Sequence, residues 1–79
     1  MFISMTDAPD QALAALLKQL REERDVTQEQ LAFDAGITSS ALSRIERGLN
    51  SPGWMTLKRI VEALDISLIE LVSALEQKP

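Results

Sequence analysis

An arginine and three serines form the group whose types and spacing could best do chemistry: Ser39, Ser40, Ser43 and Arg44. A guanidinium can donate two parallel hydrogen bonds to the O6 and N7 atoms of guanine, and a serine hydroxyl can contact a phosphate or a base edge. The alternative is a capping serine beside a solvated arginine. The group is therefore a candidate for hydrogen-bonded recognition of nucleic acid.

Catalytic chemistry finds little support in the composition. The chain has no His and no Cys, so thiolate chemistry, the usual zinc sites and histidine acid–base catalysis lack their side chains. Neighbouring acids such as Glu22 and Glu23 fit a solvated helix face, and a chain of 79 residues leaves no room for a sizeable pocket. We therefore expect a protein that is not an enzyme and that needs no cofactor, metal or small-molecule ligand.

Positive charge is concentrated in the middle third of the sequence. The net charge of −4, taken alone, argues against a nucleic-acid partner. Residues 36–60, however, contain four cations and one acid, whereas residues 1–35 and 61–79 are net acidic. Such asymmetry indicates a charged partner. Because no apolar run approaches the roughly 18 residues of a membrane helix, we expect a cytoplasmic protein with no membrane partner.

Apolar periodicity, caps and breakers predict five short helices and no strands. Their expected ranges are residues 9–24, 27–35, 38–48, 54–64 and 67–76. Capping-box patterns open two of these helices, at residues 27–30 and 67–70. The sequence therefore predicts one all-α domain over residues 9–76, between short tails at residues 1–8 and 77–79.

The second and third predicted helices have the spacing of a pair that crosses over a tight turn. Ala32 is small enough for the closest approach of the two helices, and Gly36 tolerates the positive φ that the turn requires. Leu42 and Ile45 then face the shared core. This arrangement leaves Arg44 on the outer face of the third helix.

Several short stretches carry a resemblance to a known family: LR at 20–21, TQEQLA at 27–32, AGIT at 35–38, SRIERG at 43–48, Pro52, TL at 56–57, AL at 63–64 and ISL at 66–68. Residues 11–75 resemble the Cro/CI-type, lambda-repressor-like helix-turn-helix family, also called the XRE family. The resemblance implies a five-helix fold, sequence-specific binding of double-stranded DNA by the third helix, and a homodimer on a two-fold operator. Gly53 departs from the usual Ser or Thr cap, and the chain is more acidic than is typical of the family.

The resemblance also implies roles for individual residues. It places DNA contacts at the start of the second helix, along the third helix and in the loop after it, at Gln28, Thr38, Ser39, Ser40, Ser43, Arg44, Arg47 and Asn50. Gln28, together with the free N–H groups of its helix, can hold a phosphate. Arg21 and Glu46 are expected to form a buried or half-buried salt bridge that orients the third helix.

Four apolar side chains need separate interpretation. Trp54 fills a usually aliphatic position and is expected to pack in the core, whereas Phe33 either covers the edge of the first helix or meets another protein. Ile69 and Val72 point away from the inward stripe of the last helix, and surplus apolar surface of this kind marks an interface. We expect a homodimer centred on that helix; the alternative is contact with the N-terminal tail.

Two functions fit these observations. The first is a transcriptional regulator that binds a pseudo-palindromic operator in the major groove as a homodimer, such as a restriction–modification controller or a phage-type repressor. The second is an antitoxin- or coactivator-like protein-interaction module on the same fold, which the acidic ends of the chain and Phe33 would serve. Salt-sensitive binding to duplex DNA distinguishes them, because only the first depends on phosphate contacts.

Overall fold

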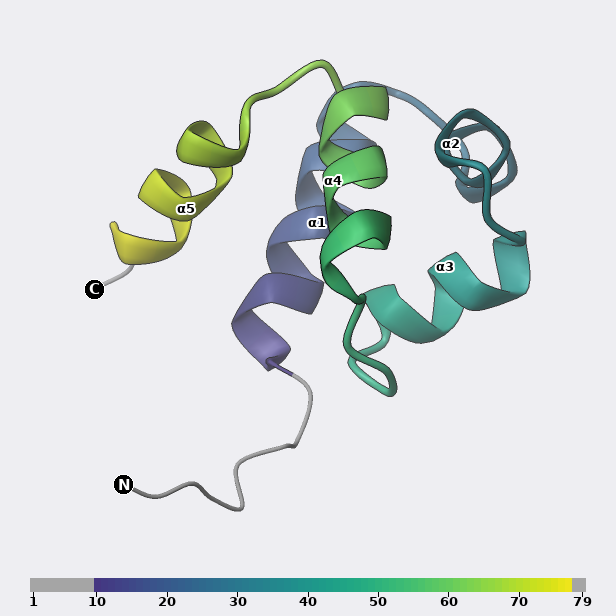
Figure 1. Ribbon diagram of the computed structural model, residues 1–79, viewed down its shortest axis with the longest axis horizontal. Coiled ribbons are helices and arrows are strands. Elements are labelled where there is room, and N and C mark those ends of the chain that lie inside the picture. The colour runs from purple at the N-terminus through teal and green to yellow at the C-terminus, as the bar shows by residue number, and fades with distance from the viewer. Residues whose placement is uncertain (1–9, 78–79) are drawn as a thin grey trace.

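The computed structural model describes residues 10–77. Its helices are α1 (Gln11–Glu23), α2 (Gln28–Ala35), α3 (Ser39–Glu46), α4 (Trp54–Ala63) and α5 (Leu68–Glu76). Figure 1 shows α2 and α3 on one side of α1 and α4, with α5 on the other side. The described residues contain no strand. The predicted all-α, five-helix fold is thus confirmed, while the predicted tail at residues 1–8 lies outside the described part of the chain.

Side-chain caps fix where the first three helices begin. Asp10 Oδ1 accepts hydrogen bonds from two backbone N–H groups of α1, at 2.9 and 3.2 Å, so this helix begins at Gln11 rather than at the predicted residue 9. The hydroxyls of Thr27 and Thr38 each accept a backbone N–H three residues along, at 3.0 Å, and open α2 and α3. Each cap satisfies a donor that the helix itself cannot.

Of the two predicted capping boxes, one is complete. Ser67 Oγ accepts the Glu70 N–H at 3.0 Å, and Glu70 Oε1 accepts the Ser67 N–H at 2.7 Å. At α2 only the Thr27 half forms: the Gln30 side chain lies along the helix, where its Nε2 donates to Asp34 Oδ1 at 3.0 Å, and its Oε1 does not accept the Thr27 N–H. The prediction of a reciprocal bond from Gln30 is therefore wrong.

Two glycines end the helices of the turn motif. Gly36 and Gly48 both have φ near 74°, where a side chain is strained. Gly36 follows α2 as predicted, whereas α3 ends at Glu46, two residues before its predicted end at Gly48. A Cβ on Gly48 would also collide with the side chain of Gln11, whose Nε2 donates to the Gly48 carbonyl at 3.0 Å. This bond joins the start of α1 to the end of α3.

The core draws on all five helices. Its fully buried side chains are Leu17, Leu31, Leu42, Ile60, Val61, Leu64 and Leu71. Polar contacts supplement it at one end of the molecule, where Arg24 Nε donates to the Leu64 carbonyl at 2.7 Å and ties the end of α1 to the end of α4. Within residues 10–77 no helix is both long and apolar enough to cross a membrane.

Candidate nucleic-acid interface

Helix α3 has one face in the core and one face in solvent. Leu42 and Ile45 are buried, and they hold the helix against its neighbours. Ser39, Ser40 and Arg44 are exposed on the other face, whereas Ser43 is half-buried. Residues four apart lie together on a helix, so Ser40 lies next to Arg44. The structure thus places Ser39, Ser40 and Arg44 on the solvent side of α3, with Ser43 at the edge of that face.

A buried carboxylate fixes the end of α3. The side chain of Glu46 is only 1% exposed and forms a two-pronged salt bridge with Arg21: Nε to Oε2 at 2.8 Å and Nη2 to Oε1 at 3.1 Å. The remaining Nη1 of Arg21 donates to the Val26 carbonyl at 2.8 Å. The hydrogen bond to Glu46, more than the attraction between the charges, raises the pKa of Arg21 above its usual value, against the effect of burial. The pair therefore joins α1 to α3 through two charge-assisted hydrogen bonds.

Gln28 belongs to the same network, which sequence reasoning missed. Its Nε2 donates to Glu46 Oε1 at 2.9 Å, so the first residue of α2 is tied to the last residue of α3. An amide nitrogen has two donors, and the second is left for another acceptor. The bond joins residues 18 positions apart, and no local pattern signals it.

The loop after α3 folds back onto Arg44. The backbone N–H groups of Leu49 and Asn50 both donate to the Arg44 carbonyl, at 2.9 and 3.3 Å. With its amide oriented to satisfy both atoms, Asn50 accepts from Arg44 Nε at 3.1 Å and donates to the Leu49 carbonyl at 2.8 Å. Asn50 thus lies beside the guanidinium of Arg44, whereas Arg47 is exposed and extends from the same end of α3.

The two aromatic side chains singled out by sequence are both exposed. Trp54 is 60% exposed, so the expectation that it packs in the core is wrong. Its spacing places it on the same side of α4 as the apolar residues of that helix. It lies in the first turn, however, and the buried Ile60 and Val61 are in later turns. Phe33 is 80% exposed and does not cover the edge of α1; it borders an open groove between α2 and α4.

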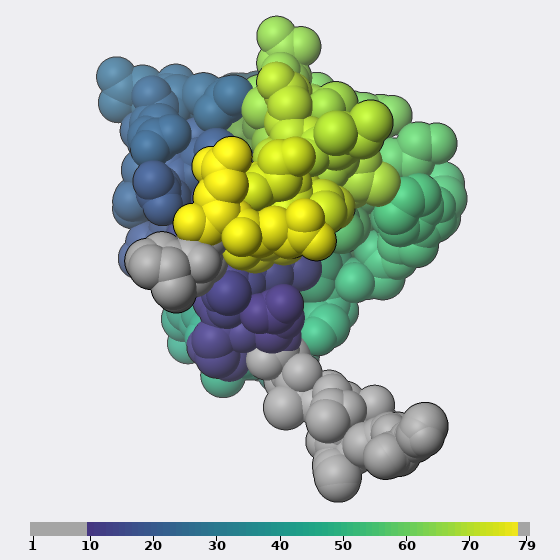
Figure 2. All heavy atoms as spheres, turned by 90° about the vertical axis from the view of Figure 1, so that its left-hand side faces the viewer, coloured from purple at the N-terminus to yellow at the C-terminus, as the bar shows by residue number. Residues whose placement is uncertain are grey.

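Helix α5 presents apolar side chains outward. Ile69 and Val72 are 78% and 45% exposed, and with Leu68 and Ser73 they line an open, mainly apolar hollow of about 260 Å³. In Figure 2 this helix lies across the face toward the viewer. The inward side of α5 is anchored by the buried Leu71.

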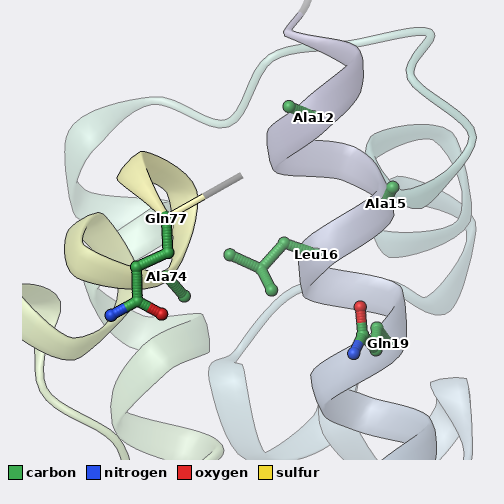
Figure 3. Close-up of a pocket in the computed structure, with 6 residues that line it drawn as sticks. All are labelled: Ala12, Ala15, Leu16, Gln19, Ala74 and Gln77. Carbon is green, nitrogen blue, oxygen red and sulfur yellow. The ribbon is translucent and has the colours of Figure 1, made fainter. Parts of the chain in front are cut away.

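A second hollow, of about 230 Å³, separates α1 from α5. Its lining, drawn in Figure 3, consists of Ala12, Ala15, Leu16, Gln19, Ala74 and Gln77. None of these side chains is charged, and no group of three or more metal-binding side chains gathers anywhere in the described residues. The polar side chains of the hollow are thus the neutral amides of Gln19 and Gln77.

Known proteins share both the sequence pattern and the fold. A helix-turn-helix family model matches residues 17–71. An uncharacterised HTH-type transcriptional regulator of Sinorhizobium fredii is 36% identical over 61 residues, which cover 77% of this chain and 79% of that protein. The HTH-type transcriptional repressor RghR of Bacillus subtilis is 45% identical over 51 residues, which cover 63% of this chain and 38% of RghR.

The fold is similar to that of a solved regulator. A crystal structure of a variant of the restriction–modification controller protein C.Esp1396I superposes with a TM-score of 0.82 and 27% identity, covering 85% of this chain and 87% of that one. The family match spans more than half of the chain and includes the turn motif between α2 and α3. The chain therefore belongs to the Cro/CI-type, or XRE, family of DNA-binding helix-turn-helix transcriptional regulators, which are not enzymes.

Proposed function

We propose that this chain binds a pseudo-palindromic operator as a homodimer, with α3 of each copy in the major groove. The observation that carries the proposal is the asymmetry of α3: its inner face is fixed by Leu42 and the buried Glu46, and its outer face presents Arg44 between hydroxyls. A rigidly held helix with a free donor surface suits the reading of base edges.

The proposed contacts divide into two kinds. Arg44 reads a base, most directly guanine through a two-pronged hydrogen bond, and the serines contact base edges or phosphates. Contacts with phosphates on either side of this base contact fix the position of α3 along the duplex. The full proposed set is Gln28, Thr38, Ser39, Ser40, Ser43, Arg44, Arg47 and Asn50. The hydrogen bond that Arg44 Nε donates to the Asn50 amide oxygen supports a second task for Asn50, because it restrains the guanidinium and does not use its Nη groups.

The dimer is proposed to form through the outward face of α5. Ile69 and Val72 would bury against their copies across a two-fold axis, which removes apolar surface from water. A dimer of this kind sets the two α3 helices roughly 34 Å apart, about one turn of DNA. The operator would then carry two half-sites with that spacing.

Selection from a random duplex library at fixed salt tests the proposal. We expect enrichment of a palindrome whose half-sites are one turn apart, and loss of preference at one base pair per half-site in Arg44→Ala. That loss corresponds to roughly 1–3 kcal/mol of base discrimination, or about 5- to 150-fold. Arg59→Ala is the matched control, because it removes the same charge from α4 at the groove beside Phe33. Equal loss in both variants would contradict base reading by Arg44.

A second candidate function rests on Phe33. An aromatic ring that is 80% exposed beside an open groove on α2 and α4 favours a protein-interaction module of the antitoxin or coactivator type. The same selection separates the two functions. A wild-type chain that enriches no duplex, even at low salt, would favour the interaction module.

A further inference from the structure

Three large apolar side chains are exposed in the short segment where α3 passes into α4. Leu49, Trp54 and Met55 are 50%, 60% and 55% exposed. The other large apolar side chains exposed among residues 10–77 lie elsewhere, one on α2 and two on α5. Neither the core nor the proposed dimer face accounts for the patch formed by Leu49, Trp54 and Met55, which we call the α3–α4 patch.

The α3–α4 patch lies next to the proposed DNA-reading residues. In Figure 1 the start of α4 and the end of α3 are at the same end of the molecule, with the connecting loop beneath them. Backbone hydrogen bonds from Leu49 and Asn50 to the Arg44 carbonyl hold this loop against α3. A ligand that contacts Arg44 from outside therefore has the loop and the first turn of α4 beside it.

The exposed charged side chains within residues 36–60 are all positive. Lys58 is exposed four residues after Trp54, so the two side chains share a face of α4. Arg47 is exposed at the other side of the loop. The only acid in residues 36–60 is Glu46, which is buried and paired with Arg21. Within its own segment of the chain the patch is thus flanked by the exposed cations Arg47 and Lys58, which are complementary to a polyanion.

We propose that Trp54 contacts the sugar–phosphate backbone of the duplex that α3 reads. The indole side chain has one N–H donor and no acceptor atom, so it suits a phosphate oxygen. The flat ring covers apolar deoxyribose, and Lys58 neutralises a neighbouring phosphate. This inference rests on the proposed function, and adds to it a contact made from α4 rather than from the turn motif.

A second copy of this chain fits the α3–α4 patch less well. Two copies meeting there across a two-fold axis would bring Lys58 and Arg47 of each close to the same cations of the other. Like charges at an interface are unfavourable. The hollow on α5, lined by Leu68, Ile69, Val72 and Ser73, has no charged side chain in its lining and offers a dimer contact without this repulsion.

The protein carries its own probe for this contact. Trp54 is the single tryptophan of the sequence, so intrinsic emission reports on one site. We expect the emission of the wild-type chain to change on titration with the selected duplex, with the midpoint given by anisotropy of the labelled duplex. Without DNA, the emission should stay constant as the protein concentration is raised through the dimer range.

Substitutions separate the ring from its donor. Trp54→Ala should weaken binding to the selected duplex about tenfold. Trp54→Phe keeps a ring and loses the N–H, so its loss of affinity should be smaller than that of Trp54→Ala. Because no charge is removed, the dependence of affinity on salt should keep its slope, whereas Lys58→Ala should lower the slope by about one. Phe33→Ala is the matched control, since it removes an exposed aromatic ring from α2; we expect wild-type affinity. Thermal unfolding checks that each variant is folded.

The outcomes of these experiments separate the Trp54 contact from the proposed binding of DNA by the chain. Unchanged emission and unchanged affinity of Trp54→Ala, in a wild-type chain that binds the duplex, would overturn the contact and leave the regulator intact. Emission that follows protein concentration without DNA would instead assign the α3–α4 patch to a second copy. A wild-type chain that binds no duplex overturns both.

Discussion

Helices α3 and α5 are built alike and present opposite surfaces. Each is one of the shorter helices, opens on a hydroxyl cap and buries a leucine, Leu42 or Leu71. The outer face of α3 carries an arginine and serines, whereas that of α5 carries Ile69 and Val72. The inner faces fix where each helix lies, and the outer faces determine what each can bind. A polar, cationic surface suits DNA, and an apolar surface suits protein.

The two helices also differ in how they are held. Helix α3 is tied at its end by Glu46 to Arg21 and Gln28. Helix α5 has its capping box and the core contact of Leu71. Orientation matters more for α3, because base reading requires donors at fixed positions, while an apolar face tolerates small shifts. This difference leads to three predictions.

The largest effect is expected from breaking the ion pair of α3. Glu46→Ala leaves the largely buried Arg21 without its partner, which should cost about 3–5 kcal/mol of unfolding free energy. Replacing both residues, as in Arg21→Met with Glu46→Leu, should cost less, because no buried charge then remains unpaired. Urea unfolding measures the stability and operator binding measures the consequence for α3. A Glu46→Ala variant with both wild-type stability and wild-type affinity would refute the orienting role.

A smaller effect is expected from placing a charge on the outer face of α5. Ile69→Glu should leave the monomer folded, because that side chain is 78% exposed, but should disfavour the proposed dimer. Sedimentation should show a monomer at tens of micromolar, and operator affinity should fall about a hundredfold or more as bivalent binding is lost. Phe33→Glu is a matched control, with the same change at a comparably exposed site on α2. A wild-type chain that sediments as a monomer at these concentrations would itself contradict the role given to α5.

Local features of the fold could be predicted from the sequence. The stops at Gly36 and Gly48 and the caps at Thr38 and Ser67 depend on a residue type and on neighbours within four positions. Such interactions act over one turn of helix, so the spacing in the sequence determines them. The end of α4 was likewise predicted from a local pattern, and it differs from the observed end by a single residue.

Contacts between distant segments could not be read from the same patterns. The bonds from Gln28 to Glu46 and from Arg24 to the Leu64 carbonyl join residues 18 and 40 positions apart. The exposure of Trp54 has a similar cause. Periodicity gives the direction of a side chain but does not show whether a neighbouring element extends far enough to cover it. Resemblance to a family supplied the Arg21–Glu46 pairing that periodicity could not.

The smallest effect compares the caps of the two helices. Thr38→Ala and Ser67→Ala each remove a hydroxyl that accepts a backbone N–H at 3.0 Å, and each should cost about 1 kcal/mol of unfolding free energy. Equal losses of stability should nevertheless have unequal consequences. Thr38 is itself a proposed DNA contact, and fraying the first turn of α3 displaces Ser39 and Ser40, so Thr38→Ala should weaken the contact with each half-site at any protein concentration. Ser67→Ala should act only through the dimer, and its loss of affinity should disappear once the protein concentration exceeds the dimer dissociation constant. If both variants lose affinity equally at saturating dimer concentration, the distinction between a reading helix and an assembly helix is wrong.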